Sequence, residues 1–379
     1  MNELLQTFGS GVRKALFALL VVCISATAAP VPQRTAPPKP SPVPQRTAPP
    51  KPSPVPQRTA PPKTVPAQPT IQKPAPKKKV VIRVKNYKNI PMLNMADVAD
   101  FYGMKYLVNG EGITFLSKYS TITFTVNSRV MVLNNVQMYL SRPITVMDNV
   151  NYIGKSDFQL LLEPILRPKT VIPKTSLTTI VVDPGHGGKD VGAINGKDYE
   201  KNINLQVALR LASKLREKGF KVFMTRSTDK DVTLEQRTDF ATAMKADLFV
   251  SIHCNSAAAS VTGLETYIAT PTGDPPVGDT KPMKSKCPAN AYDLQNAYIA
   301  YYTQRTILRN TKCEDRGLRR KRFYVIRNTT CPSMLIEIGF ISNDTELKSL
   351  KQSVRQEQIA DAIVESLLRF RNLKLDAKK

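Results

Sequence analysis

The stretch TIVVDPGHGG, Thr179–Gly188, sets the fold of the carboxyl-terminal half of this 379-residue chain. Its first four residues, Thr179–Val182, form an apolar run that stops at a Pro-Gly turn, which is typical of a buried strand that ends in a loop. A helical pattern follows, with apolar residues on one face and Gly219 at its end. This alternation predicts an α/β domain with a mainly parallel sheet flanked by helices.

The same alternation continues to about Phe370, so we expect this domain to span residues 176–372. Thr233 and Gln236 have the spacing of a capping box, which predicts a helix from there toward Ala246. We expect the other strands at Phe220–Thr225, Leu248–Ile252, Gly263–Ala269, Tyr324–Ile326 and Met334–Ile338, and further helices at Tyr292–Arg309 and Ser353–Phe370.

The chain has two histidines, and each directly follows a predicted buried strand. In an open α/β sheet the functional crevice lies outside the carboxyl ends of the strands, so His186 and His253 can face one site. A catalytic zinc commonly takes three protein ligands and leaves one position for water. Glu200 is the natural third ligand, while Asp183 could ligate instead or could orient His186. From these residues alone, two unrelated structural histidines remain an open alternative.

Four separated motifs of the carboxyl-terminal half resemble, in sequence and in order, the zinc-dependent N-acetylmuramoyl-L-alanine amidase family with a type 3 catalytic domain. They are VVDPGHGGKDVGA (Val181–Ala193), YEKNINL (Tyr199–Leu205), SIHCNS (Ser251–Ser256) and PSMLIEIGFISN (Pro332–Asn343). The resemblance implies a peptidoglycan hydrolase that cleaves the amide bond between N-acetylmuramic acid and the L-alanine of the stem peptide with zinc-activated water.

The resemblance also implies the roles of individual residues. It implies one Zn²⁺ per catalytic domain, held by His186, Glu200 and His253, and Glu337 as the catalytic carboxylate that does not bind the resting metal. The apolar neighbours of Glu337 in LIEI fit this role, because burial raises the pKa of a carboxyl toward a useful value. Asn255, Glu265 and Asp183 are candidates for orienting the ligands or contacting substrate.

Two other functions stay open. A zinc peptidase or carboxypeptidase would cut within the stem peptide, and a non-catalytic wall-binding protein would use the same fold without turnover. The sequence has the expected residue at all three metal-binding positions and at the catalytic position, which argues against the second alternative. Cys254 lies beside His253, but alternation along a strand points it to the opposite face, so we expect it to pack and not to ligate.

The amino-terminal residues 1–28 have the pattern of a secretory signal peptide. Arg13 and Lys14 precede the apolar run Ala15–Ile24, and small residues surround Ala28. A bilayer span needs roughly 20 apolar residues, so we expect cleavage and no stable membrane span afterwards. The chain is therefore predicted to be exported to the periplasm or cell wall. Cys23 leaves a lipid anchor as a lesser alternative.

Residues 29–79 are rich in proline, lysine and arginine. The unit PVPQRTAPPKPS occurs twice from Pro30, and a shortened third copy ends at Thr64. Proline favours extended polyproline II, so we expect a disordered, spacer-like linker. The chain carries a net charge of +25, much of it here, which suits an anionic wall polymer or a solvated linker. No nucleic-acid recognition motif is present, and export argues against a nucleic-acid partner.

The sequence pattern of residues 80–168 predicts a small, β-rich α+β accessory module. Strand patterns occur at Val80–Val84, Ile113–Leu116, Thr121–Val126 and Val130–Leu133. Asn94 could cap a first helix, and Phe158–Leu162 could form a second. The segment loosely resembles the amine-oxidase N-terminal-like stalk modules found beside wall enzymes, and it contains no histidine. A binding or spacer role is the expectation.

Three further features of the carboxyl-terminal half lead to predictions. A disulfide could join Cys287 to Cys313 or Cys331, since an exported protein can be oxidised. The basic run Arg316–Arg322 could contact an anionic glycan or peptide carboxylates, or it could be a solvated loop. Thr270–Ala289 also reads as a loop, which argues against an autoinhibitory helix but leaves a smaller lid open. The sequence identifies no activator protein.

Overall fold

The structure of the protein is a computed structural model that describes residues 80–171 and 177–376. The predicted signal peptide, residues 1–28, and the predicted linker, residues 29–79, lie outside the described residues. None of the helices in the described part of the chain is long and apolar enough to cross a membrane.

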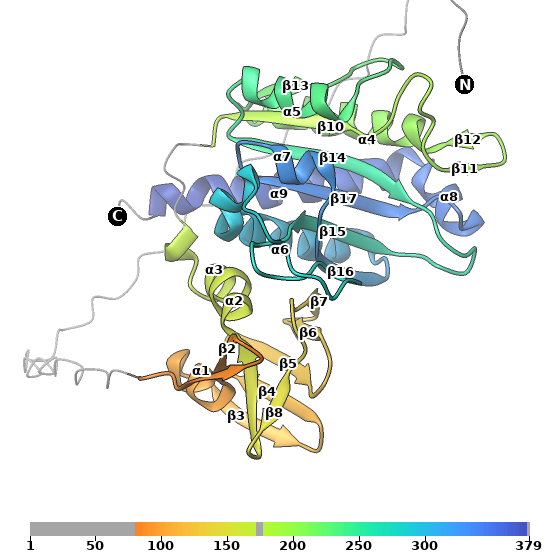
Figure 1. Ribbon diagram of the computed structural model, residues 1–379. Coiled ribbons are helices and arrows are strands. Elements are labelled where there is room, and N and C mark those ends of the chain that lie inside the picture. Colours follow the sequence, from red (N-terminus) through yellow and green to blue (C-terminus); the bar gives the residue numbers. More distant parts are fainter. Residues whose placement is uncertain (1–79, 172–176, 377–379) are drawn as a thin grey trace, which may run out of the picture. The chain divides into compact units, whose positions relative to one another are not determined.

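The carboxyl-terminal half is built on an α/β sheet. Four neighbouring strands run parallel in the order β13, β10, β14 and β17, followed by β15, antiparallel to β17, and β16, parallel to β15. Their bounds are β10 Thr179–Pro184, β13 Lys221–Met224, β14 Leu248–Asn255, β15 Leu264–Ala269, β16 Asp315–Lys321 and β17 Ser333–Phe340. The predicted α/β class is thus confirmed for this half (Figure 1).

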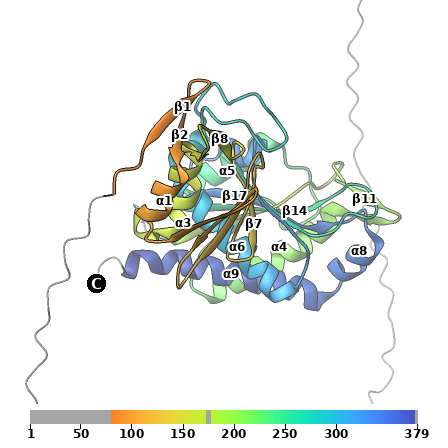
Figure 2. The same cartoon turned by 90° about the horizontal axis from the view of Figure 1, so that it is seen from below.

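Helices cover both faces of this sheet. On one face lie α4 (Glu200–Glu217), α6 (Asp293–Thr311) and α9 (Ser353–Asp376), and on the other lie α5 (Leu234–Ala243) and α7 (Tyr324–Asn328). Figure 2 shows α4, α6 and α9 on one side of the strands and α5 on the opposite side. The Thr233 side chain caps α5, and the full capping box with Gln236 is present, as predicted.

Alternation along the strands assigns each side chain to one face. On β14, Ile252 and Cys254 are buried on the face that α4, α6 and α9 cover. The side chain of His253 therefore points to the α5 and α7 face. Glu337 of β17 lies opposite His253 in the strand register, so both polar side chains share that face.

Two sequence predictions in this half were wrong. Tyr324–Ile326 is the start of helix α7 and not a strand, because Val325 and Ile326 pack side by side into the core under α5. A short apolar run does not distinguish the two structures. The basic run Arg316–Arg322 is not a loop, because most of it forms β16, where partly or fully buried arginines are paired with acidic side chains.

The predicted disulfide is absent from the described residues, where four cysteines are free thiols. Cys313 packs against the large core around α4, α6 and α9, Cys331 against the core under α5 and α7, and Cys287 in a third small cluster. The proposed partners thus pack in three different clusters.

Residues 84–171 form short strands and helices. The strands are β1 Val84–Tyr87, β2 Ile90–Asn94, β3 Lys105–Asn109, β4 Gly112–Leu116, β5 Thr121–Thr125, β6 Val130–Leu133, β7 Val136–Tyr139, β8 Thr145–Met147 and β9 Val150–Gly154. The helices are α1 Met95–Phe101, capped by the Asn94 side chain, and a helical stretch over Lys155–Leu166 that includes a π turn at Phe158–Leu162.

The predicted strand Val80–Val84 is wrong in position. The strand β1 begins at Val84, where it pairs with Leu93 of β2. The next residue of β2, Asn94, already caps helix α1, so the hairpin partner ends there. The hairpin therefore ends at the backbone hydrogen bond from the Asn94 N–H to the Arg83 carbonyl, 3.0 Å long, and β1 does not extend back to Val80.

Strand β7 joins the sheet of the carboxyl-terminal half through β16, with Met138 opposite Leu318. A buried ionic cluster surrounds Arg320, which also belongs to β16. Arg320, 1% exposed, donates through Nη1 to the Asp157 carboxylate at 2.8 Å and to the Ser141 hydroxyl at 2.7 Å. Asp274 lies 3.8 Å from the same nitrogen. This cluster ties three distant segments of the chain together.

The Thr270–Ala289 segment contacts residues of the 80–168 range. The Arg129 guanidinium donates to main-chain carbonyls of Pro275, Pro276 and Asp279. The Thr270–Ala289 segment begins directly after Ala269, at one end of β15. Glu265, the residue opposite Glu337, lies at the other end of that strand. The segment is therefore not a lid over the histidines in this structure.

Replacement of Arg320 by alanine should destabilise the protein by roughly 3–5 kcal/mol, because it leaves Asp157 buried without its charge partner. Urea unfolding of the full-length chain measures this. Arg309→Ala is the matched control, since Arg309 pairs with Glu365 at the surface, where an ion pair contributes about 0–1 kcal/mol. Equal losses in both variants would contradict the anchoring role of Arg320.

Candidate active site

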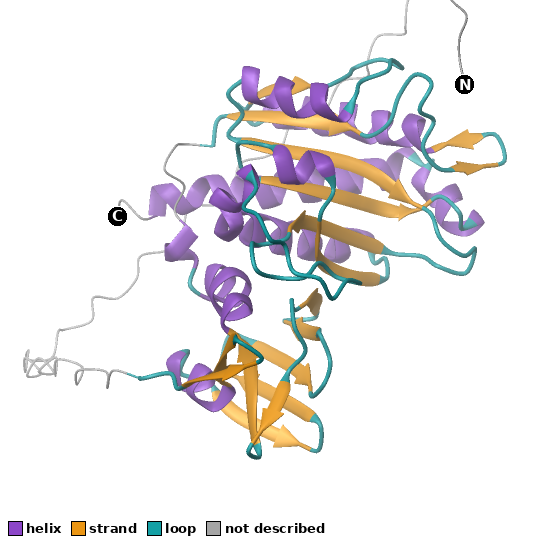
Figure 3. Ribbon diagram, in the orientation of Figure 1, coloured by secondary structure: helices purple, strands orange, loops and turns teal. Residues whose placement is uncertain are grey.

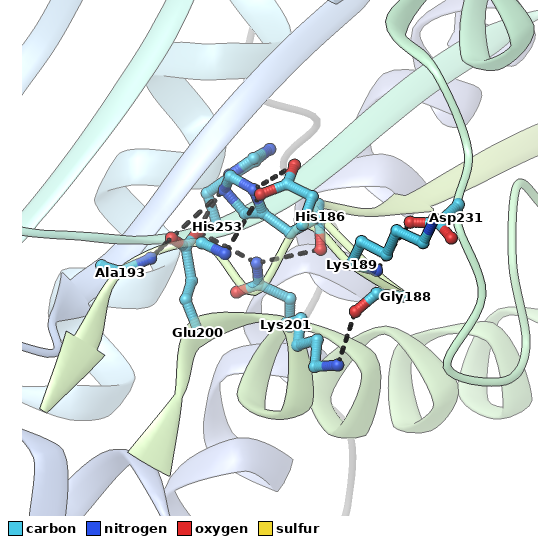
Figure 4. A network of polar contacts seen from close by, with 12 residues as sticks. His186, Gly188, Lys189, Ala193, Glu200, Lys201, Asp231 and His253 are labelled. Carbon is cyan, nitrogen blue, oxygen red and sulfur yellow. Dashed lines mark hydrogen bonds and ion pairs between the residues drawn. The ribbon is translucent and has the colours of Figure 1, made fainter. Parts of the chain in front are cut away.

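Three side chains from distant segments meet at the carboxyl end of the parallel strands. His186 follows β10, Glu200 is the first residue of α4 and His253 lies in β14. Their potential ligand atoms all lie within 4.8 Å of one another. The Glu200 carboxylate lies 3.2 Å from His186 Nε2 and 3.0 Å from His253 Nδ1 (Figure 4). Two imidazole nitrogens and one carboxylate oxygen are a donor set that suits catalytic zinc.

The backbone around His186 is strained and closely packed. His186 has φ 59°, in the left-handed region that non-glycine residues seldom adopt, and such outliers cluster at functional sites. Arg237 donates to the His186 carbonyl at 2.9 Å and holds this conformation. A Cβ at Gly185 would lie 2.2 Å from the His253 ring, so only glycine allows the two segments to approach so closely.

Glu200 is held in place from several sides. It begins α4 directly after the hairpin of β11 (Ile194–Asn195) and β12 (Asp198–Tyr199), visible beside α4 in Figure 3. Its carboxylate also accepts from the main-chain N–H groups of Ala193 and Cys254. Burial raises the pKa of Glu200, but the hydrogen bonds from both histidines outweigh this and bring the pKa far below its usual value. Glu200 is therefore ionised, as a ligand must be.

Asp190 orients the first histidine, a role that the sequence interpretation missed. Its carboxylate lies 2.8 Å from His186 Nδ1, which leaves Nε2 to face Glu200. A carboxylate on the far nitrogen of a metal-binding imidazole fixes its orientation and tautomer. Burial lowers the pKa of His186, but hydrogen bonds to Glu200 and Asp190 raise it overall. The spacing of four residues in HGGKD was the available signal.

Asp183 lies behind the three side chains and is not part of the metal-ligand group. It is fully buried and accepts hydrogen bonds from Thr225, Arg237 and Ser251. Because Arg237 also binds the His186 carbonyl, Asp183 supports His186 through that arginine. Of the two roles that the sequence left open for Asp183, this arrangement fits orientation.

Glu337 lies next to the histidines without a hydrogen-bond partner for one oxygen. Its Oε2 is buried and unpaired among the described residues. Burial, followed by the charges of Glu200 and Glu265, raises the pKa of Glu337 well above its usual value. A buried carboxylate with an unsatisfied oxygen beside a metal-ligand group has the properties of a general acid or base.

Glu265 pairs with Glu337 across β15 and β17 but is itself fully engaged. It accepts from Asn255 at 2.9 Å, from Arg316 at 3.1 Å and from the Tyr267 hydroxyl. The two candidate residues Glu265 and Asn255 are thus brought together beside Glu337, in a network that carries no metal-ligand geometry. The arginine partners of Glu265 were not identified from the sequence.

The comparisons with known proteins bear on this half of the chain. The family described as N-acetylmuramoyl-L-alanine amidase matches residues 180–369. The uncharacterized protein YqiI of Bacillus subtilis (strain 168) is 37% identical over 190 residues, which are 50% of this chain and 82% of YqiI. The N-acetylmuramoyl-L-alanine amidase CwlM of Bacillus licheniformis is 35% identical over 204 residues, 53% of this chain and 72% of CwlM.

Among solved structures, the chain is similar to the catalytic domain of CwlV, an N-acetylmuramoyl-L-alanine amidase from Bacillus (Paenibacillus) polymyxa var. colistinus. The identity is 32%, the match covers 52% of this chain and 99% of that domain, and the TM-score is 0.44.

Asp190→Asn should weaken zinc binding by about 10- to 100-fold, because the His186 ring loses the carboxylate that orients it. Competition with a chromophoric chelator measures the affinity. Asp198→Asn is the control, since Asp198 pairs with Lys351 and does not touch the histidines. Wild-type affinity in Asp190→Asn would rule out the orienting role.

Proposed function

The chain belongs to the N-acetylmuramoyl-L-alanine amidase family of peptidoglycan hydrolases, and we propose that the site around His186, Glu200 and His253 performs the hydrolysis with one bound Zn²⁺ and with Glu337 as the proton carrier. The observation that carries the proposal is the convergence of three ligand atoms within 4.8 Å beside a buried, unpaired carboxylate oxygen.

The donor set fits the metal. Glu200 is ionised, His186 presents Nε2 and His253 presents Nδ1 toward it, so the three side chains would hold zinc on one side and leave the cavity side open. Zinc, when bound, supplies a Lewis acid that acidifies water and polarises the carbonyl of the scissile amide.

Glu337 moves the proton in the proposed reaction. Its unpaired oxygen takes a proton from the water that attacks the lactyl carbonyl, and the carbon–oxygen bond forms. It then gives this proton to the nitrogen of L-alanine as the carbon–nitrogen bond breaks. The products are a muramic acid carboxylate and a stem peptide with a free amino terminus. Arg237 and Asp190 keep His186 in place throughout.

We propose the same organisation for the whole chain as the sequence indicates. Residues 1–28 direct export, residues 29–79 act as a spacer, residues 80–168 form an accessory module and residues 176–372 carry the activity. The substrate is then the peptidoglycan of the periplasm or cell wall. Any activator protein would act on this exported form.

Release of stem peptides from purified muropeptides by the full-length chain tests the proposal. Chelation should abolish release and zinc should restore it. Glu337→Gln should lose about 10²- to 10⁴-fold in rate, the usual contribution of a general acid or base, with one zinc still bound. Glu357→Gln is the matched control, because Glu357 pairs with Arg210 and Lys214 on the surface.

The products distinguish the remaining alternatives. Intact stem peptides with free L-alanine amino termini support the amidase. Cleavage inside the stem would indicate a zinc peptidase, and the absence of any release by the zinc-loaded chain would indicate a binding protein. A wild-type rate in Glu337→Gln would contradict the role of that carboxylate.

A further inference from the structure

A cavity of about 480 Å³ adjoins the candidate active site on the face of the sheet that α5 and α7 cover. One wall contains His186, His253 and Glu337, so a ligand in the cavity touches the reaction centre. The other walls come from residues 231–234 before and at the start of α5 and from residues 323–325 at the start of α7. This volume lies in the range of small-molecule sites, about 300–1,000 Å³.

The charged groups in the lining of this cavity are mostly acidic. Asp183, Asp190 and Asp231 lie in the wall, and besides the two histidines Arg237 is the one basic residue of the lining among the described parts of the chain. Arg237 is 3% exposed, and it already donates to the Asp183 carboxylate and to main-chain carbonyls. Apart from the Zn²⁺ proposed at the histidines, a carboxylate that entered the cavity would meet like charges and no unpaired arginine or lysine.

Most of the remaining lining is apolar, and part of it is accessible. Leu234 and Phe323 are 50% and 38% exposed, and Leu335 completes the wall. Exposed apolar side chains that line a concave surface are typical of a binding site. Amino sugars offer matching uncharged surfaces, namely the C–H groups of the ring, the N-acetyl methyl group and, in muramic acid, the lactyl methyl group.

Arginine side chains lie on the other side of Glu337. Glu265, opposite Glu337 in the sheet, binds Arg316 at 3.1 Å and Arg319 at 3.2 Å, and Arg316 also lies 3.8 Å from the Glu314 carboxylate. Neither arginine lines the cavity. The side chain of Arg316 is 28% exposed and can attract the carboxylates that a stem peptide carries.

We propose that the cavity between α5 and α7 binds the uncharged glycan end of the substrate. The bound stem peptide extends from the reaction centre in the other direction, past Glu265 and Arg316. This assignment rests on the proposed amidase function and extends it, because it states which end of the substrate each side of Glu337 takes. Apolar contact selects the sugars, and the acidic wall excludes the peptide carboxylates.

Binding of the two halves of the substrate tests the assignment. The ligands are the methylamide of the disaccharide N-acetylglucosaminyl-N-acetylmuramic acid and a free stem peptide with its carboxylates. Both are titrated into the zinc-loaded full-length chain carrying Glu337→Gln, so that the amide stays intact. The same background then receives Phe323→Ala, which removes one aromatic side chain from the cavity wall, or Leu234→Lys, which adds a cation to that wall.

Phe323→Ala should raise the Kd of the disaccharide about tenfold, corresponding to roughly 1.4 kcal/mol, and change that of the stem peptide less than about twofold. Leu234→Lys should weaken the disaccharide and leave the stem peptide unchanged. Leu209→Lys is the matched control, because Leu209 is similarly exposed on α4, on the opposite face of the sheet, and neither ligand should respond.

The opposite pattern would overturn the assignment. If Phe323→Ala weakened only the stem peptide, or if Leu234→Lys tightened it, the cavity would hold the peptide end. This result is independent of the amidase proposal, since amide cleavage is measured separately with the wild-type chain. Cleavage without disaccharide binding in the cavity would reject only the present inference, while disaccharide binding without cleavage would reject only the amidase reaction.

Discussion

The contact of one carboxylate, Glu200, with two imidazoles is the constraint on which the rest of the site depends. It joins the turn after β10, the start of α4 and strand β14, which are far apart in the sequence. The close approach requires glycine at position 185 and a left-handed backbone at His186. Arg237 holds that strained turn by donating to the His186 carbonyl. Packing and hydrogen bonds elsewhere in the domain therefore stabilise a backbone conformation that the local sequence disfavours.

Three carboxylates near the site have different surroundings and hence different chemical properties. Glu200 is paired with histidines and stays ionised. Glu265 is paired with arginines and with hydroxyl and amide donors, so it is fully satisfied. Glu337 stands between them with one oxygen unpaired, and burial together with the two neighbouring charges raises its pKa. Of these three carboxylates, Glu337 is therefore the one free to exchange a proton, and it lines the cavity.

The placement of His186 and His253 could be predicted because both follow apolar strand patterns, and parallel strands end on one edge of a sheet. Asp190 could not be placed, since its contact with His186 depends on the left-handed turn between them. Strand β16 was missed because its arginines break the apolar pattern. Their partners, Asp157 and Glu265, come from distant segments that local sequence does not reveal.

X-ray absorption at the zinc K-edge of the zinc-loaded, full-length chain tests the central claim most directly. Coordination by His186, Glu200 and His253 predicts nitrogen and oxygen neighbours at about 2.0–2.2 Å, imidazole scattering from two rings and no sulfur. His253→Ala should remove one of the two imidazole contributions. A sulfur neighbour at about 2.3 Å, or an unchanged spectrum in His253→Ala, would place the metal elsewhere and contradict the account.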